Sequence, residues 1–340
     1  MSRDHTGRSP RRPRRSGGVR RFVLAAGAAT ALSVSASGCV VVHGEREVVP
    51  AATRAEAARA LKDFTTAYNA ADRTYDRTRD ADRVTGPLAA IDAAKLKAGH
   101  RNHPDGNPAH SALVFRDSEF TLPAKAAWPR WFLVNTAANK GAPGSRWLMV
   151  FTRGAAAEPW RVSYLTVLGA DQVPAFAKDD AGRAEPVPAD DPALAVEPGK
   201  LAGGYATYLR SGGDAFAAGT HTSQWRAQRK KFASKPGLAR QYLDEPLTAG
   251  DYAPVGLRTA DGGALVFFST RRYEKQTAAE GTAIPTPGAD VTALTTGEIK
   301  QTLTLEFVSN QVALDPARDA PDRRVSVLGR VEGLTGAKGE

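Results

Sequence analysis

WRVSYLTVL, residues 160–168, carries the clearest strand pattern in the chain. Every second residue is Trp, Val, Tyr, Thr or Leu, which is typical of one face of a β-strand. Working outward, similar runs lie at 130–135 and 146–152, and turns rich in Gly, Asn and Ala separate the three. Short strands joined in this way form an antiparallel meander, so the sequence predicts a sheet in this region.

A helix precedes this sheet. Thr53 and Glu56 form a capping box, in which both side chains satisfy free N–H groups at a helix start. Apolar residues then recur at helical spacing up to Ala71. Gly86-Pro87 interrupts the pattern, and a short second helix is predicted over residues 88–96. Residues 53–170 are therefore predicted to form a first α+β domain.

The second half of the chain repeats this order, with Asp261-Gly262 as a strong hairpin signal between two strands. Two helices and four strands are predicted there: helices at 200–210 and 223–233, and strands at 252–259, 264–271, 299–308 and 324–334. The fold class is thus α+β, with two tandem helix-then-antiparallel-sheet units over 53–170 and 200–335. The order of elements is similar to that of cystatin-like and nuclear-transport-factor-like cone folds.

Residues 171–199 differ from both units. The span 179–199 holds six acidic residues and four prolines, and it has too few apolar residues to pack by itself. We therefore predict an acidic, Pro-rich linker between the two domains.

The N-terminus reads as an export signal. Eight arginines and one acid precede Phe22, and a 13-residue apolar run follows, which is too short to cross about 30 Å of hydrocarbon. Small residues then lead to Cys39, the only cysteine, in a pattern that resembles the lipobox of bacterial lipoproteins, although Ala36 stands where Leu is usual. Residues 1–38 are thus predicted to be a lipoprotein signal peptide.

The resemblance to a lipobox implies that Cys39 carries a diacylglyceryl group, and that residues 39–52 tether the protein to the outer face of the cytoplasmic membrane. Extended, the 13 residues after Cys39 reach roughly 45 Å. An ordinary signal peptide, which would give a secreted protein, and a transmembrane anchor are the alternatives. Export by the general or by the twin-arginine route is left open.

Charge excludes one class of partner. The chain carries +10, but its first 38 residues hold eight Arg and one Asp, which leaves only +3 for the rest. Such a nearly balanced chain gives no electrostatic reason to bind nucleic acid. A single cysteine excludes an internal disulfide, and no phosphate-loop, dinucleotide, GxSxG or HExxH motif occurs, so no cofactor is expected.

Four segments resemble a family of uncharacterised actinobacterial cell-envelope lipoproteins. They are YNAADRTYD (68–76), WPRWFLV (128–134), LMVFTRGAAAEPWRVSYLTVL (148–168) and LRTADGGALVFFST (257–270). The resemblance implies an export signal and a helix-then-sheet body, and it brings no catalytic residues.

Three groups of residues are candidates for chemistry. The loop 100–110 holds three histidines that are weak metal-ligand candidates, His100, His103 and His110, and exposure in a polar loop is the alternative. Aspartates on the predicted helices, such as Asp72 and Asp92, would suit acid–base work, but no histidine falls on a predicted core element.

The basic helix 223–233 is the candidate surface-binding element. Its four cations are Arg226, Arg229, Lys230 and Lys231, and they could contact anionic lipid or envelope polymers. The alternative is a solvated face with Trp225 and Phe232 packed inward. We therefore expect a non-enzymatic binding or scaffold lipoprotein with an unknown envelope protein or polymer as its partner. The alternative is a surface-anchored hydrolase or a small-ligand carrier with a sheet-lined cavity.

Overall fold

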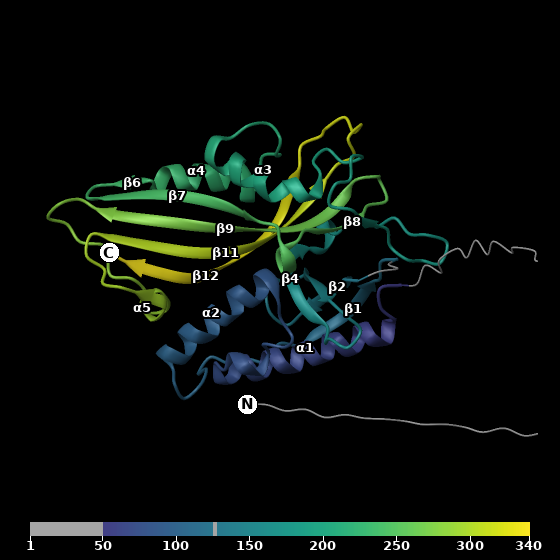
Figure 1. Ribbon diagram of the computed structural model, residues 1–340, viewed down its shortest axis with the longest axis horizontal. Helices are drawn as coiled ribbons and strands as arrows, with labels where there is room; N and C mark the ends of the chain where they lie inside the picture. Colours follow the sequence, from purple (N-terminus) through teal and green to yellow (C-terminus); the bar gives the residue numbers. More distant parts are fainter. Residues whose placement is uncertain (1–49, 125–127) are drawn as a thin grey trace, which may run out of the picture. The chain divides into compact units, whose positions relative to one another are not determined.

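Two sheets pack face to face in this protein, and helices cover the outer side of each sheet (Figure 1). The computed structural model describes residues 50–124 and 128–340. Strands make up 38% and helices 28% of the chain, which confirms a mixed α+β fold in which sheet predominates.

The first sheet is an antiparallel meander in the order β1-β2-β3-β4. Its strands are β1 (Phe115–Thr121), β2 (Arg130–Ala138), β3 (Ser145–Arg153) and β4 (Arg161–Gly169). Two helices precede it, α1 (Arg54–Thr74) and α2 (Gly86–Asn102), with the 3₁₀ turn η1 (Arg77–Arg79) between them. The meander predicted around residues 160–168 is therefore confirmed.

The second sheet has the order β10-β12-β11-β9-β7-β6, with β8 paired to β9 and to β5. Its strands are β5 (Pro186–Val187), β6 (Ser234–Lys235), β7 (Leu238–Leu247), β8 (Val255–Arg258), β9 (Ala264–Ala278), β10 (Thr295–Thr296), β11 (Thr302–Asp315) and β12 (Ser326–Gly339). Five helical elements accompany it among the described residues: α3 (Pro198–Ser211), the π-helical turn η3 (Thr220–Gln224), α4 (Trp225–Phe232), the 3₁₀ turn η4 (Gly250–Tyr252) and α5 (Ala289–Leu294).

Strand β9 is buried on both faces, which explains its long apolar run. Val266 and Phe268 pack against α3, while Leu265 and Phe267 pack against the first sheet. Successive side chains of a strand point to opposite faces, so one strand serves two apolar layers. On the far side of the first sheet, α1 adds its own layer through Phe64 and the residues around it.

Helix α1 begins as the sequence predicts. The Thr53 hydroxyl accepts a hydrogen bond from the backbone N–H of Glu56, and the Glu56 carboxylate accepts from that of Thr53. Helix α2 begins at Gly86 and runs to Asn102, beyond the predicted 88–96. The whole helix packs on other elements, and this tertiary burial extends it past the range that its own pattern indicates.

The acidic segment before α3 packs onto the second sheet rather than lying free. β5 pairs with β8, Leu194 is fully buried, and Asp191 forms an ion pair with Arg258. The segment has few apolar residues of its own, but the neighbouring strands supply the hydrogen-bond and packing partners that hold it in place. The division into domains 53–170 and 200–335 stays a prediction.

The predicted signal peptide, Cys39 and the predicted tether up to residue 49 lie outside the described residues. The described chain starts at Pro50, which bridges to Ala124. None of the helices in residues 50–124 and 128–340 has the length and apolar character that crossing a membrane requires.

Candidate anion-binding site around helix α4

Helix α4 lies on the outer face of the second sheet beside β7 (Figure 1). Trp225, Arg229 and Phe232 follow a spacing of four and three residues, so they share the side of the helix that faces the strands. Arg226 and Lys230 form the neighbouring side, and both have open space next to them. The helix therefore presents one buried and one accessible row of side chains.

Arg229 is the anchor of this helix. It is only 7% exposed, and its Nη2 lies 2.8 Å from Oδ1 of Asp244 on β7. Its guanidinium also lies 4.9 Å from the ring centre of Trp225 and 5.3 Å from that of Tyr242. An arginine and a carboxylate in this fork arrangement form one of the stronger polar contacts in proteins.

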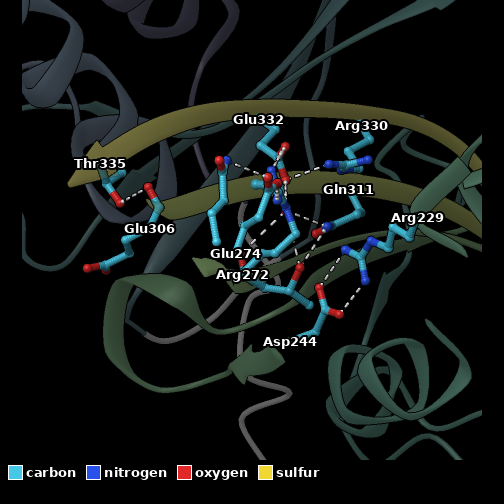
Figure 2. Close-up of polar contacts among 12 residues, drawn as sticks. Arg229, Asp244, Arg272, Glu274, Glu306, Gln311, Arg330, Glu332 and Thr335 are labelled. Carbon is cyan, nitrogen blue, oxygen red and sulfur yellow. Dashed lines mark hydrogen bonds and ion pairs between the residues drawn. The ribbon is translucent and has the colours of Figure 1, made fainter. Parts of the chain in front are cut away.

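Arg272 is the centre of a second charge cluster beside the first (Figure 2). Its Nη1 lies 2.9 Å from Glu274 and its Nη2 lies 2.8 Å from Glu332, while its guanidinium stacks 3.8 Å from the centre of the Phe307 ring. Burial alone would lower the pKa of Arg272, but Glu332 and Glu274 raise it above the ordinary value. The arginine therefore stays charged inside the fold.

Trp225 packs against three guanidinium groups at once. The nearest belongs to Arg330, 4.2 Å from the ring centre, followed by Arg229 at 4.9 Å and Arg272 at 5.7 Å. Cations favour the faces of indole rings, so the ring holds the cluster together. Burial would raise the pKa of Glu332, but Arg330 and Arg272 lower it below its usual range.

Three N–H donors around α4 are buried and have no hydrogen-bond acceptor in the described part of the chain. They are Trp225 Nε1, Arg226 Nε and Arg229 Nε. A buried donor without an acceptor costs about 1–3 kcal/mol.

Two cavities lie on the two flanks of α4, and Arg229 and Tyr242 line both. The larger, of about 530 Å³, has Arg210, Arg226 and Lys230 in its wall. The smaller, of about 290 Å³, is lined by aromatic and charged side chains: Trp225, Phe232, Lys235, Arg240 and Glu274. Both cavities are therefore bordered by cations.

The larger cavity carries an excess of positive charge. Asp244 is its one acidic lining residue, and Arg229 neutralises it. Among the described residues, no carboxylate forms an ion pair with Arg210, Arg226 or Lys230. Three cations beside unpaired donors suit an anion.

The structure places the four predicted surface cations differently from one another. Lys230 and Lys231 are exposed, and Arg226 is partly buried over the Tyr208 ring at 5.3 Å. Arg229 lies beneath them in its ion pair with Asp244, because a guanidinium can pair with a carboxylate inside the fold when its fork geometry is met. Trp225 and Phe232 are partly buried.

The candidate metal ligands do not come together. His110 Nδ1 lies 2.8 Å from Asp72, whereas His103 stacks on Tyr75 at 6.3 Å and His100 is exposed at the end of α2. In residues 50–124 and 128–340, no group of three or more His, Cys, Asp or Glu side chains is arranged to hold a metal ion.

Several residues of the site were not anticipated from the sequence. They lie on strands of the second sheet and on α3: Arg210, Tyr242, Asp244, Arg272, Glu274, Arg330 and Glu332. A signal does exist, because Arg272 and Glu274, and again Arg330 and Glu332, are two positions apart and so share one strand face. Charged pairs at this spacing inside an apolar strand indicate a buried ion-pair cluster.

The comparisons with known proteins agree with the resemblance seen in the sequence. A model of a family described as a domain of unknown function, DUF8094, matches residues 48–339, and the chain belongs to this family. An uncharacterized lipoprotein of Streptomyces coelicolor and one of Streptomyces avermitilis are each 61% identical over 340 residues, which is 100% of both chains.

A more distant relative extends the same pattern. A second uncharacterized lipoprotein of Streptomyces coelicolor is 27% identical over 326 residues, which cover 87% of this chain and 89% of the relative. No solved structure matches the chain. The predicted membership in an actinobacterial lipoprotein family is thus confirmed.

Proposed function

We propose that this member of the DUF8094 family is a lipid-anchored, non-enzymatic binding protein that holds a phosphate-bearing molecule of the cell envelope at α4. Its relatives are named lipoproteins, which supports anchoring through a diacylglyceryl group on Cys39 at the outer face of the membrane. Two acyl chains give stable attachment. The tandem arrangement of two helix-then-sheet units remains part of this proposal.

One observation carries the proposed ligand. Arg210, Arg226 and Lys230 line the larger cavity beside α4, and none of them has a carboxylate partner in the described residues. Phosphate supplies several acceptor oxygens and negative charge together, and arginine binds it with two parallel hydrogen bonds. A neutral ligand would leave the charge of Arg210, Arg226 and Lys230 uncompensated.

The buried clusters support an ordered site. Arg229, Arg272 and Arg330 are held by carboxylates and by Trp225, so α4 is fixed on the sheet before any ligand arrives. A site whose side chains are already ordered loses less entropy on binding. The accessible cations next to this frame are then free to contact the ligand.

The test uses the protein carrying Cys39→Ser, so that its own acyl chains do not bind membranes. One arm measures its binding to phosphatidylcholine vesicles with and without phosphatidylglycerol, and the other measures binding to soluble polyphosphate by calorimetry. Vesicle binding alone would identify a lipid headgroup, and polyphosphate binding alone a soluble or polymeric phosphate. Binding to neither would refute the proposal.

The variants sharpen this test. Replacing Arg226 and Lys230 together by Ala is expected to weaken binding roughly 30-fold, since each cation near an anionic surface contributes about 1 kcal/mol. Lys97→Ala, which removes an exposed cation on α2, is the matched control and should bind like the unmodified protein. Equal losses in both variants would point to non-specific charge attraction instead of a site.

A further inference from the structure

Two buried carboxyl groups lie near the N-terminal half of α2, one on the segment before the helix and one on the helix itself. Asp80 follows η1 and is 1% exposed, and Asp92 on α2 is 5% exposed. Both line a cavity of about 360 Å³, together with Thr85 and Tyr252. The two carboxyl groups are close enough for each to shift the pKa of the other.

Neither carboxyl has a cationic partner. Within the described residues no ion pair includes Asp80 or Asp92, and Oδ2 of Asp80 has no donor from another group. Burying a lone carboxylate is costly, and two carboxylates in contact cannot both ionise cheaply. A proton held between the two groups removes both costs, because it supplies the missing donor and cancels one charge.

The surrounding charges do not change this conclusion. On α2 itself, the Lys95 ammonium is engaged 3.0 Å from Asp72 of α1. From η1 and the loop after it come Arg77, an exposed residue that lines the same cavity but forms no ion pair with either carboxyl, and Asp82, whose charge opposes ionisation of Asp80. From η4 come two further groups, Tyr252 in the cavity wall and Asp251, which accepts a hydrogen bond from the Thr85 hydroxyl.

The pKa values of the two carboxyl groups also favour a retained proton. Burial, reinforced by the neighbouring Asp92, raises the pKa of Asp80 to about 8. Burial also raises the pKa of Asp92, although its hydrogen bond to Asp80 and the Lys95 charge oppose the shift. The pair titrates as a unit, so these values describe the two groups together.

Helix α2 connects elements from both halves of the chain. Leu88, near its start, belongs to the apolar cluster beneath the first sheet. Ile91 packs directly on the backbone of Gly333 in β12, and Ala94 and Ala98 pack against Leu294 of α5. A change at the start of α2 would therefore reach both sheets.

We propose that Asp80 and Asp92 share one proton, that this proton fixes the start of α2 in place, and that its loss in alkaline medium loosens α2. The pair then acts as a pH-sensitive joint between the first sheet and β12. A protein exposed at the outer face of a membrane would meet such changes of pH directly.

The sign of the effect follows from the binding of the proton. The folded pair keeps a proton that the unfolded chain releases above about pH 4. Stability from this proton is therefore fully present below about pH 4 and declines as the pH rises to about 8. The unfolding equilibrium constant of the unmodified protein is expected to rise roughly tenfold for each pH unit in this window, in addition to the contributions of other groups.

Asp80→Asn tests the proposal because an amide donates to Asp92 as the protonated carboxyl does. This variant should lose the tenfold dependence, and Asp105→Asn, which changes an exposed loop residue, should keep it. If Asp80→Asn does not fold, Asp92→Asn takes its place, and its pH dependence is compared with that of the unmodified protein. An identical pH dependence in Asp80→Asn and the unmodified protein would overturn the proposal.

Hydrogen exchange separates a joint from a mere packing defect. At pH 9, after correction for intrinsic exchange rates, the amides of α2 in the unmodified protein should lose protection relative to pH 6. The same amides in Asp80→Asn should remain protected. Protection of α2 that does not change with pH in the unmodified protein would also overturn the proposal.

Discussion

Arg229 of α4 and Asp244 of β7 form a two-pronged ion pair, with Nη1–Oδ2 and Nη2–Oδ1 distances of 2.5 and 2.8 Å. Their side chains are only 8% and 5% exposed. This pair joins a short helix, which would be marginal alone, to the edge region of a long sheet. It therefore decides whether the candidate site exists at all, although Arg229 itself is too deep to act as a free surface cation.

Arg229→Ala is predicted to destabilise the protein by about 3–5 kcal/mol, because Asp244 would remain as a buried charge without a partner. Urea unfolding followed by circular dichroism measures the change. The double variant Arg229→Met, Asp244→Leu should recover most of the loss, since it removes both charges and keeps the volume. An unchanged unfolding midpoint in Arg229→Ala would contradict the importance of this pair.

Gly329→Ala is predicted to destabilise the protein by about 1–3 kcal/mol through overpacking. A Cβ at this position of β12 would lie 2.6 Å from Oγ1 of Thr166 and 2.8 Å from a methyl group of Leu168 on β4. Gly336→Ala in the same strand is the matched control, because its nearest neighbour would be 3.7 Å away. Thermal unfolding of both variants checks the difference, and equal melting temperatures would argue against close packing of β12 on β4.

Asp315→Asn is predicted to make the protein more stable at pH 8. Asp315 is 1% exposed, and burial raises its pKa to about 7, so the folded state holds a proton that the unfolded chain has lost. Stability from this group is present below about pH 4 and is lost as the pH rises to about 7, by about 1 kcal/mol per unit. Urea unfolding at pH 5 and pH 8 measures the gain.

The control for this prediction is Asp319→Asn, four residues away on an exposed turn. It should leave the difference between pH 5 and pH 8 unchanged. Oδ1 of Asp315 accepts a hydrogen bond from the Val196 N–H at 3.2 Å, and the side-chain oxygen of Asn in Asp315→Asn can still accept it. A variant that is less stable than the unmodified protein at pH 8 would show that Asp315 is charged in the fold.

Cys39→Ser is predicted to release the protein from the membrane fraction of the cells that produce it. The thiol is the one group in the chain that can receive a diacylglyceryl chain at the end of the export signal. Metabolic labelling with palmitate should mark the unmodified protein and not the variant. Equal membrane attachment of both proteins would favour a different anchor.

The elements that depend on local pattern could be predicted from the sequence. The capping box at Thr53 and Glu56, the alternation that ends at Leu168 and the hairpin at Asp261 are each decided by a few neighbouring residues. Such signals act through the backbone close by, so distant packing does not overrule them.

The elements that depend on distant partners could not be predicted. Strand β7 (Leu238–Leu247) carries charges and Pro246, so its pattern does not resemble a strand. In the structure its charged side chains pair with α4 and β9, Asp244 with Arg229 and Arg240 with Glu274. Arg229 reads as a surface residue for the same reason, since Asp244 is 15 positions away. Asp80 and Asp92 belong to different elements, and only the fold brings them together.

The position of Trp225 gives the protein an optical reporter. It is the one tryptophan after residue 160, and its ring lies among three guanidinium groups and lines the smaller cavity of α4. Indole emission responds to nearby charge, so an anion that draws these cations toward itself would change the spectrum. With Phe in place of the other four tryptophans, fluorescence alone would follow occupancy of the site without any added label.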